Sequence, residues 1–465
     1  MDFENLLSSP PQFFSQFLRL ALSLLRSTIA PSYRRSVLGR CSLADFDIDP
    51  QTGFFPRHPL PRLTGAHQLW EQGLAKASGN IYLGIDTRPE ALEKRPFGER
   101  WRKEINDWPV LDASLLCANS DLLRRAHYVL AWLVHYYVHS QPCTDDESCI
   151  RVPKSLAVPL VQVSRRLDIA PVLTFADTVL WNLEPVDPCQ SLSLHSIDSM
   201  RAVNLFSGTE DEKSFYVTSA KAELRGIEVL RIVEEFRNLP NADDLTTLSK
   251  LSRDLARLAK IIDDISEIIQ NVRSDCDPEI FHQFVRPWFV GSDAGPNGPN
   301  WVYEGVSNSD QLDLSGPSAG QSSIMHALDI FLDIDHKLRQ KRYPAPSPMN
   351  KRADLGFMER MRRYMPGKHR EYLSRLASMP RTIRDVAQST PALREPYDTA
   401  VDALKRLRDL HLRVACLYIV SMSRRCPMMA RLDHAAGPCR GTGGTEVSIL
   451  LKTGRDNTRR AMFKS

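Results

Sequence analysis

The sequence lacks three features that would place it in a specialised class of protein. It has nine cysteines among 465 residues, an odd number, and no C-x-x-C pair. A disulfide framework or a structural zinc site is therefore not expected, and reduced thiols in the cytoplasm are. No run of about 18 uninterrupted apolar residues occurs, which is the minimum for a membrane-spanning helix. No unit recurs at a period of about 20 to 50 residues, and this excludes solenoid architectures.

Charge of either sign is also not in large excess. Lys plus Arg number 60 and Asp plus Glu 56, so the net charge is +4. A protein whose main task is to bind a phosphate backbone carries a larger basic excess, and nucleic acid is therefore not an expected partner. Hydrophobic residues make up 42% of the chain and charged residues 25%, which is typical of soluble globular proteins. The composition indicates a globular protein of the size of an enzyme.

Residues 1–50 read as an extension before the body of the protein. An apolar stretch runs from Phe13 to Leu25, but Asp2 and Glu4 precede it, where a signal peptide carries positive charge. We expect an amphipathic helix that packs on the body. A helix that lies on a membrane surface or targets an organelle is the alternative.

Helical periodicity dominates the sequence and predicts an all-α protein. Residues 244–271 place leucine and isoleucine at spacings of three and four, with charged residues on the opposite face. This pattern predicts a long helix with one face in the core. Residues 121–138 are apolar nearly all round, which predicts a helix buried between others.

Irregular segments suggest the domain organisation. Residues 187–212 are rich in proline, serine and aspartate, and we interpret them as the connection between two domains. A small helical domain with this linker is predicted for residues 51–200, and a large helical domain for residues 201–465. The segment 421–445 is longer than ordinary connections, and loops of this length are usually mobile or functional.

Two motifs have modest explanations that compete with functional ones. His135 and His139 have the i, i+4 spacing of a metal-binding pair, but no H-E-x-x-H motif or third ligand accompanies them, so packing is favoured. Residues 441–445 read GTGGT, which could cradle an anion. They lack the lysine of a P-loop and do not fit G-x-G-x-x-G, so a hinge or a backbone that closes on a ligand is favoured.

His411 lies on a predicted apolar helix face. That face contains Ala400, Leu404, Leu407, His411, Val414 and Tyr418. A buried imidazole requires hydrogen-bond partners, or it is costly to place in a core. Residue chemistry alone favours a satisfied core histidine over a metal or haem ligand, and it leaves both open.

Eight sequence blocks resemble those of the indoleamine 2,3-dioxygenase family, single-chain haem enzymes that oxidise L-tryptophan to N-formylkynurenine. The blocks occur in the family's order and spacing between about residues 55 and 465. They are IAPVLTFADTVLWN (169–182), SFYVTSAKAE (214–223), FVRPWFVG (284–291), WVYEG (301–305), SGPSAGQSS (315–323), MRRYMPGKHREYL (361–373), LRDLHLRVACLYI (407–419) and GTGGT (441–445). The resemblance implies a small N-terminal helical domain, a large helical domain that holds haem b, and a monomeric chain.

The resemblance also assigns the residues that hold the haem. His411 matches the proximal iron ligand, which leaves the opposite face of the iron open for dioxygen. Arg408 matches the residue that pairs with a haem propionate. Asp329 matches the acidic residue that reaches the second ring nitrogen of the ligand, directly or through water.

On the substrate side, Arg286 matches the arginine that holds the substrate carboxylate, and Ser219 the hydroxyl near the bound oxygen. Thr442 matches the loop residue that closes over the substrate. The other implied pocket residues are the aromatic walls Phe215 and Phe281, the inner end Phe175, Thr178 and Val179, and the backbone wall Ser318, Ala319 and Gly320. Phe175 and Thr178 stand where some members carry tyrosine and cysteine.

The implied activity is cleavage of the indole 2,3-bond of L-tryptophan, with both atoms of O2 entering the product. This is the first step of the kynurenine route toward NAD synthesis. The reaction requires an electron donor that reduces the haem but no general base, and residues 421–445 would form a lid. A haem-binding regulatory or signalling paralogue with little turnover is the alternative, and a haem-free helical scaffold is a weaker one. Arg286 and Ser219 favour the enzyme, because a protein that only bound haem would not need a carboxylate clamp.

Overall fold

The structure is a computed structural model that describes residues 42–142, 149–187, 189–239, 244–292, 300–335, 356–423, 441–442 and 446–463. The predicted extension before residue 42, and residues 424–440 and 443–445 of the predicted lid, lie outside these ranges. The chain divides into two compact units, Met1–Asp45 and Phe46–Ser465. The division of the second unit near residue 200 stays a prediction.

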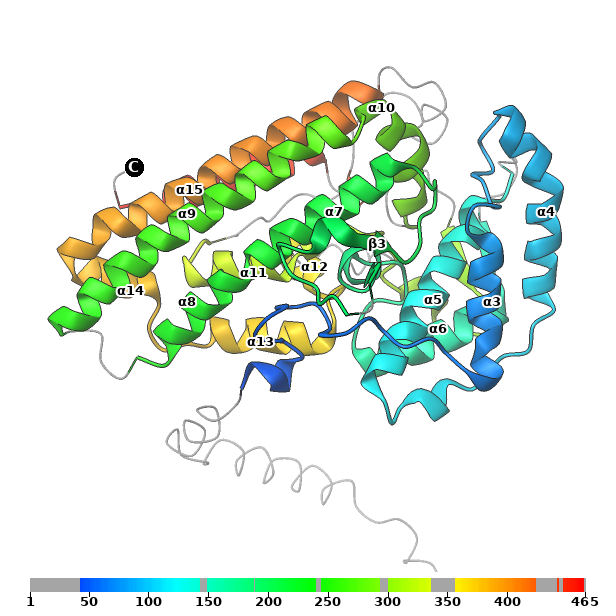
Figure 1. The fold of residues 1–465 in the computed structure, drawn as a ribbon, viewed down its shortest axis with the longest axis horizontal. Coiled ribbons are helices and arrows are strands. Elements are labelled where there is room, and N and C mark those ends of the chain that lie inside the picture. Colours follow the sequence, from blue (N-terminus) through cyan, green and yellow to red (C-terminus); the bar gives the residue numbers. More distant parts are fainter. Residues whose placement is uncertain are drawn as a thin grey trace, which may run out of the picture. The chain divides into compact units, whose positions relative to one another are not determined.

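Helices dominate the described ranges, and the predicted all-α fold class is confirmed (Figure 1). Those before residue 277 are α3 (Gln68–Ala77), α4 (Pro89–Asn106), α5 (Ser120–His139), α6 (Lys154–Leu167), α7 (Glu210–Arg225), α8 (Ile227–Arg237) and α9 (Leu245–Asp275). Those after it are α10 (Pro278–Ile280), α11 (Ser323–Phe331), α12 (Phe357–Arg362), α13 (Gly367–Ala377), α14 (Ile383–Ser389), α15 (Pro391–Ala415) and α17 (Val447–Arg460). Figure 1 shows α3–α6 gathered at one end of the second unit and α7–α15 at the other.

Short helical turns connect these helices. The 3-10 turns are η1 (Leu43–Phe46), η2 (Gly65–His67), η3 (Ala113–Leu116), η5 (Ile197–Ser199), η7 (Arg286–Phe289), η8 (Ser309–Gln311) and η9 (Ala319–Gln321). The π-helical turns are η4 (Ala176–Leu180), η6 (Phe281–Val285) and η11 (Cys416–Ser421).

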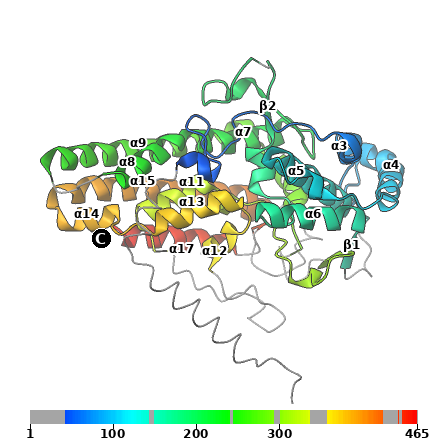
Figure 2. The same cartoon turned by 90° about the horizontal axis from the view of Figure 1, so that it is seen from below.

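The predicted long helix over 244–271 is confirmed as α9. It begins after Asp244, whose carboxylate accepts the backbone N–H of Thr247 at 2.9 Å and so satisfies one of the free donors of the first turn. The leucine and isoleucine face of α9 is buried against α15, which runs beside it in the same direction (Figures 1 and 2). Polar contacts occur in the same order along both helices: Arg406 pairs with Asp263, and further on the Tyr418 hydroxyl donates to the carbonyl of Val272. Figure 2 also shows α17 on another side of α15.

The predicted buried helix over 121–138 is confirmed as α5. It begins after Asn119, whose side chain accepts the N–H groups of Asp121 and Leu122, and all its residues from Leu123 to Val138 are buried except Arg124. A helix enclosed on all sides fits a sequence that is apolar nearly all round.

Short strands are the feature that the sequence did not predict. β1 (Cys149–Val152) pairs in parallel with β4 (Asn300–Tyr303), and β2 (Leu183–Pro185) pairs antiparallel with β3 (Met200–Ala202). The second pair encloses the first half of the segment that was interpreted as an irregular linker. Three or four residues are too few to show the alternation by which a strand is found in sequence.

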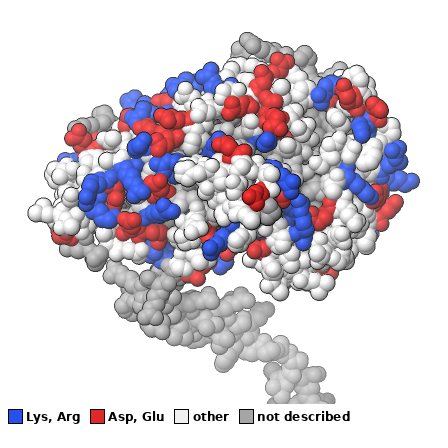
Figure 3. Space-filling view, in the orientation of Figure 1, with Lys and Arg blue, Asp and Glu red and all other residues white. Residues whose placement is uncertain are grey.

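The visible face of the second unit carries both signs of charge. Figure 3 shows Lys and Arg interspersed with Asp and Glu over this face. Several lie in ion pairs across helices, such as Arg257 with Glu228 and Arg225 with Asp264. None of the helices in the described ranges is both long and apolar enough to cross a bilayer.

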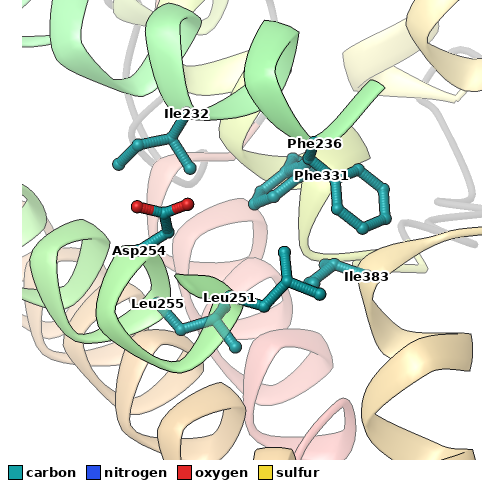
Figure 4. Close-up of a pocket in the computed structure, with 7 residues that line it drawn as sticks. All are labelled: Ile232, Phe236, Leu251, Asp254, Leu255, Phe331 and Ile383. Carbon is teal, nitrogen blue, oxygen red and sulfur yellow. The ribbon is translucent and has the colours of Figure 1, made fainter. Parts of the chain in front are cut away.

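A small apolar hollow of about 190 Å³ lies between α8, α9, α11 and α14 (Figure 4). Its lining residues are Ile232, Phe236, Leu251, Asp254, Leu255, Phe331 and Ile383. The Phe236 and Phe331 rings meet edge to face at 5.4 Å, and Asp254 pairs with Lys250. The hollow is too narrow to hold a water molecule, so we interpret it as a gap in packing.

The α9–α15 contact should dominate the stability of the fold. Leu258 on α9 is fully buried, whereas Leu245 at the start of the same helix is 86% exposed. Leu258→Ala should lower the free energy of unfolding by about 2–5 kcal/mol, because it leaves a cavity in a packed interface. Leu245→Ala should change it by less than about 0.5 kcal/mol. Denaturant titration of the two variants measures the difference, and equal values would contradict the assigned packing.

Candidate active site

His411 lacks the hydrogen bonds of a satisfied core histidine. It is half-buried near the end of α15, and neither ring nitrogen hydrogen-bonds to another residue within the described ranges. Burial, and then the charge of Arg408, lowers the pKa of the imidazole. The ring is therefore neutral near pH 7, which is the form that binds a metal.

Arg408 and Asp329 form a buried pair close to His411. The Asp329 carboxylate on α11 is 4% exposed and accepts from the Arg408 guanidinium. The guanidinium also donates to the hydroxyl of Thr458 and, at 3.4 Å, to the carbonyl of Gly454, both on α17. Three helices therefore meet one turn before His411. The roles predicted for Arg408 at a propionate and for Asp329 at the imidazole stay predictions.

An aromatic cluster lies on the continuation of the same helix. The rings of Phe215 on α7 and Phe281 on η6 are 4.7 Å apart, and Phe281 lies 5.6 Å from the ring of Tyr418 on η11. Tyr418 comes seven residues after His411, which is about two helical turns along one face. The structure thus brings both predicted aromatic walls to the helix that carries the candidate ligand.

Arg286 begins η7 beside this cluster and is 5% exposed. One turn earlier, His282 is fully buried, and neither of its ring nitrogens has a hydrogen-bond partner among the residues that the structure describes. Burial, and then the charge of Arg286, lowers the pKa of His282 to about 4. A buried guanidinium beside a neutral histidine is well suited to attract a carboxylate out of water.

Ser219 lies on α7 between Phe215, which belongs to the aromatic cluster, and Glu223, which contacts Ser322. Phe215, Ser219 and Glu223 are spaced four apart on one face of α7. Phe215 contacts Phe281, and the Glu223 carboxylate accepts from the hydroxyl of Ser322, which caps α11. Burial raises the pKa of Glu223 to about 7. The Ser219 hydroxyl donates to the carbonyl of Phe215 at 3.0 Å.

The predicted inner end and backbone wall of the pocket also meet. The backbone N–H of Phe175, which precedes η4, donates to the side-chain oxygen of Gln321 at 2.8 Å. η4 continues from there with Thr178 and Val179, both buried. The wall Ser318–Gly320 runs directly into Gln321. Thr442 donates to the carbonyl of Pro317 at 2.6 Å, so the start of the GTGGT segment lies against this wall.

Residues 316–320 read G-x-S-x-G, the pattern of a serine hydrolase nucleophile elbow. The structure does not support that chemistry. The elbow requires a turn between a strand and a helix, whereas residues 312–317 contain no strand. The hydroxyl of Ser318 accepts the N–H of Gly320 at 3.2 Å and caps η9.

The favoured packing role of the His135 and His139 pair is supported by the contacts of His135. Nδ1 of His135 donates to the carbonyl of Trp288 at 2.6 Å, and Nε2 accepts the N–H of Leu173 at 3.3 Å. Both ring nitrogens are therefore used for structure. In the part of the chain that the structure describes, no group of three or more His, Cys, Asp or Glu side chains could hold a metal ion.

Three buried polar residues of the site were missed from the sequence: Gln321, Glu223 and Asp177. The Asp177 carboxylate accepts the N–H and hydroxyl of Thr174 at 2.8 and 2.7 Å and lies 2.9 Å from Nδ1 of His127. Asp177 is polar within an otherwise apolar block, which was a signal, whereas Gln321 and Glu223 stand among other polar residues and nothing in the sequence distinguishes them. The partner of Gln321 lies 146 residues away, and no spacing rule finds such a pair.

Comparison with known proteins covers nearly the whole chain. The profile of the family described as Indoleamine 2,3-dioxygenase matches residues 42–461. Indoleamine 2,3-dioxygenase 1 of Rattus norvegicus is 29% identical over 426 residues, which cover 90% of this chain and 96% of the relative. Indoleamine 2,3-dioxygenase 2 of Homo sapiens is 30% identical over 428 residues, covering 90% and 94%. Indoleamine 2,3-dioxygenase of Saccharomyces cerevisiae is 27% identical over 451 residues, covering 90% and 92%.

The profile match spans the aromatic cluster, the buried Arg286, both walls and His411. The relatives align over almost their full length, so the similarity extends over the candidate site as a whole. We conclude that the chain belongs to the indoleamine 2,3-dioxygenase family, whose members are haem-dependent dioxygenases.

Proposed function

We propose that this enzyme cleaves the indole 2,3-bond of L-tryptophan with O2 to give N-formylkynurenine, using haem b bound at His411. The observation that carries the proposal is the contact between Phe281 and Tyr418: Arg286 is buried directly after the turn that carries Phe281, and Tyr418 follows two turns after the neutral imidazole of His411. Haem, when bound, supplies the activation of O2 that no side chain can supply. An electron donor must keep its iron reduced.

The residues around His411 fit a haem group. The imidazole makes no hydrogen bond to another described residue, so a nitrogen is available for iron. Arg408 lies one turn away, where a fixed cation suits a propionate. Asp329 holds that guanidinium in place and so orients it.

The residues assigned to the substrate side of the site fit tryptophan. Arg286 would bind the carboxylate through two parallel N–H donors, and the rings of Phe215 and Phe281 would enclose the indole and exclude water. The Oγ hydroxyl of Ser219 would lie close to the reacting indole ring of the substrate. These residues act by orientation, and the proposal requires none of them to act as a general base.

Further parts of the proposal concern the whole protein. We propose a monomer in a reducing compartment, the cytoplasm. The five described cysteines are all free thiols, which supports that compartment. They are Cys117, Cys149, Cys189, Cys276 and Cys416.

The direct test is a product assay. Haem-loaded wild-type protein, supplied with a reductant, should convert L-tryptophan to N-formylkynurenine, detected by mass and absorbance. Haem binding without product would refute the proposed activity and favour a regulatory paralogue.

His411→Ala should abolish stable haem binding, because it removes the only side chain that the proposal gives to the iron. The Soret band after reconstitution measures this. His195→Ala is the matched control, since His195 is exposed and should leave the Soret band unchanged. An unaltered Soret band in His411→Ala would exclude His411 as the ligand.

Arg286→Ala should retain haem but lower kcat/KM for L-tryptophan by about 100-fold, because a buried ion pair with the carboxylate is lost. Tryptamine lacks that carboxylate and serves as the internal control. The wild-type preference for L-tryptophan over tryptamine should therefore collapse in the variant. A preserved preference would place the carboxylate elsewhere.

A further inference from the structure

Two pocket walls that lie far apart in the sequence are joined by one side-chain amide. Gln321 is 2% exposed. Its Oε1 accepts the backbone N–H of Phe175 at 2.8 Å, and its Nε2 donates to the carbonyl of Gly316 at 2.9 Å. The first contact reaches the turn before Thr178 and Val179, and the second reaches the start of the Ser318–Gly320 wall.

The orientation of this amide is fixed by chemistry. A backbone N–H can only donate and a backbone carbonyl can only accept, so the oxygen of Gln321 must face Phe175 and its nitrogen must face Gly316. Both bonds are buried, where a polar group left without a partner is costly. Gln321 is therefore a spacer of fixed length between the two walls.

The far side of the same turn is anchored independently. Asp177 binds the N–H and hydroxyl of Thr174 and lies 2.9 Å from Nδ1 of His127 on α5. The second ring nitrogen of His127 lies 3.1 Å from the carbonyl of Ala170. These contacts hold the turn together and attach its far side to α5, so the turn can shift as one body about that attachment, and Gln321 sets its distance from the opposite wall.

The opposite wall has little freedom of its own. A side chain on Gly320 would place its Cβ 2.8 Å from the ring of Phe357, so the backbone is pressed against α12 there. On the other side of Gln321, the Ser322 hydroxyl accepts the N–H of Met325 at the start of α11. A change in Gln321 should therefore move the Phe175 turn rather than the wall.

We propose that Gln321 is a positioning residue that sets the width of the inner pocket and thereby selects among ring-substituted tryptophans. This inference rests on the proposed function, because it takes the indole as the occupant. The proposal places the carboxylate at Arg286 and the benzo edge of the ring against the Phe175 turn, which the resemblance assigns to the inner end of the pocket. Releasing that turn makes room for a substituent at ring carbon 5 and loosens the fit of L-tryptophan itself.

The first variant is Gln321→Met, which keeps the volume and removes both hydrogen bonds. Steady-state kinetics on haem-loaded protein should show KM for L-tryptophan raised about tenfold, with kcat changed far less. The ratio of kcat/KM for 5-methyl-tryptophan to that for L-tryptophan should rise at least about fivefold. Ser155→Ala is the matched control, because it removes one buried hydrogen bond between α6 and α4, to the carbonyl of Ile105. It should lower Tm and leave this ratio unchanged.

The second variant keeps the test decisive if Gln321→Met fails to fold. In Gln321→Glu the protonated acid reproduces both bonds, with its hydroxyl donating to Gly316 and its carbonyl oxygen accepting from Phe175. The carboxylate instead faces the Gly316 carbonyl with a second acceptor. Its substrate ratio should match wild type at low pH and rise as pH increases, whereas the wild-type ratio stays constant. The ratio cancels the pH dependence of the chemical step.

The outcomes separate the two proposals. Wild-type protein that binds haem and makes no N-formylkynurenine refutes the proposed function. Active wild-type protein together with an unchanged substrate ratio in folded Gln321→Met, and a pH-independent ratio in Gln321→Glu, refutes the positioning role alone.

Discussion

The packing of α15 against α9 is the constraint on which the candidate site depends. One face of α15 contributes the leucines that bury the helix, and the same run of helix then presents His411 and, seven residues on, Tyr418. Tyr418 donates to the carbonyls of Val272 and Cys276 at the end of α9. The position of the imidazole and the position of the aromatic cluster are therefore fixed by one helix pair, and the two cannot move apart without unpacking it.

Long elements with a regular apolar pattern were predictable from the sequence. The apolar face of α9 and the enclosed α5 both occur as expected, because an apolar pattern repeated over many turns identifies a helix more reliably than a short pattern does. The short strand pairs were not predicted. The three π-helical turns of the described chain were also beyond sequence reasoning, although each lies at the site: η4 carries Thr178, η6 carries Phe281, and η11 comes after His411. One extra residue in a helical turn re-aims the side chains after it, and such turns are frequent at functional sites.

The site residues divide in the same way. Periodicity predicted that His411 lies on an apolar helix face, and the resemblance of the eight blocks to the family predicted that it binds the haem iron. The structure adds one relationship: Asp329 pairs with Arg408, so its carboxylate serves the guanidinium next to the imidazole. A sequence pattern can indicate that Asp329 lies near His411. It cannot show whether the carboxylate pairs with the Arg408 guanidinium or with a ring nitrogen of His411, because that depends on the angle between α11 and α15.

Buried polar groups are costly to remove from water, and their directional hydrogen bonds fix the positions of the segments that form the site. Gln321, Glu223 and Asp177 each satisfy groups on another segment of the chain, and each lies directly behind a residue assigned to the pocket. Apolar packing alone would tolerate small shifts of these segments, because hydrophobic contact is not directional. A buried hydrogen bond is directional and costly to leave unmade. The aromatic cluster therefore supplies the dry environment of the pocket, while these polar contacts set the distances between its walls.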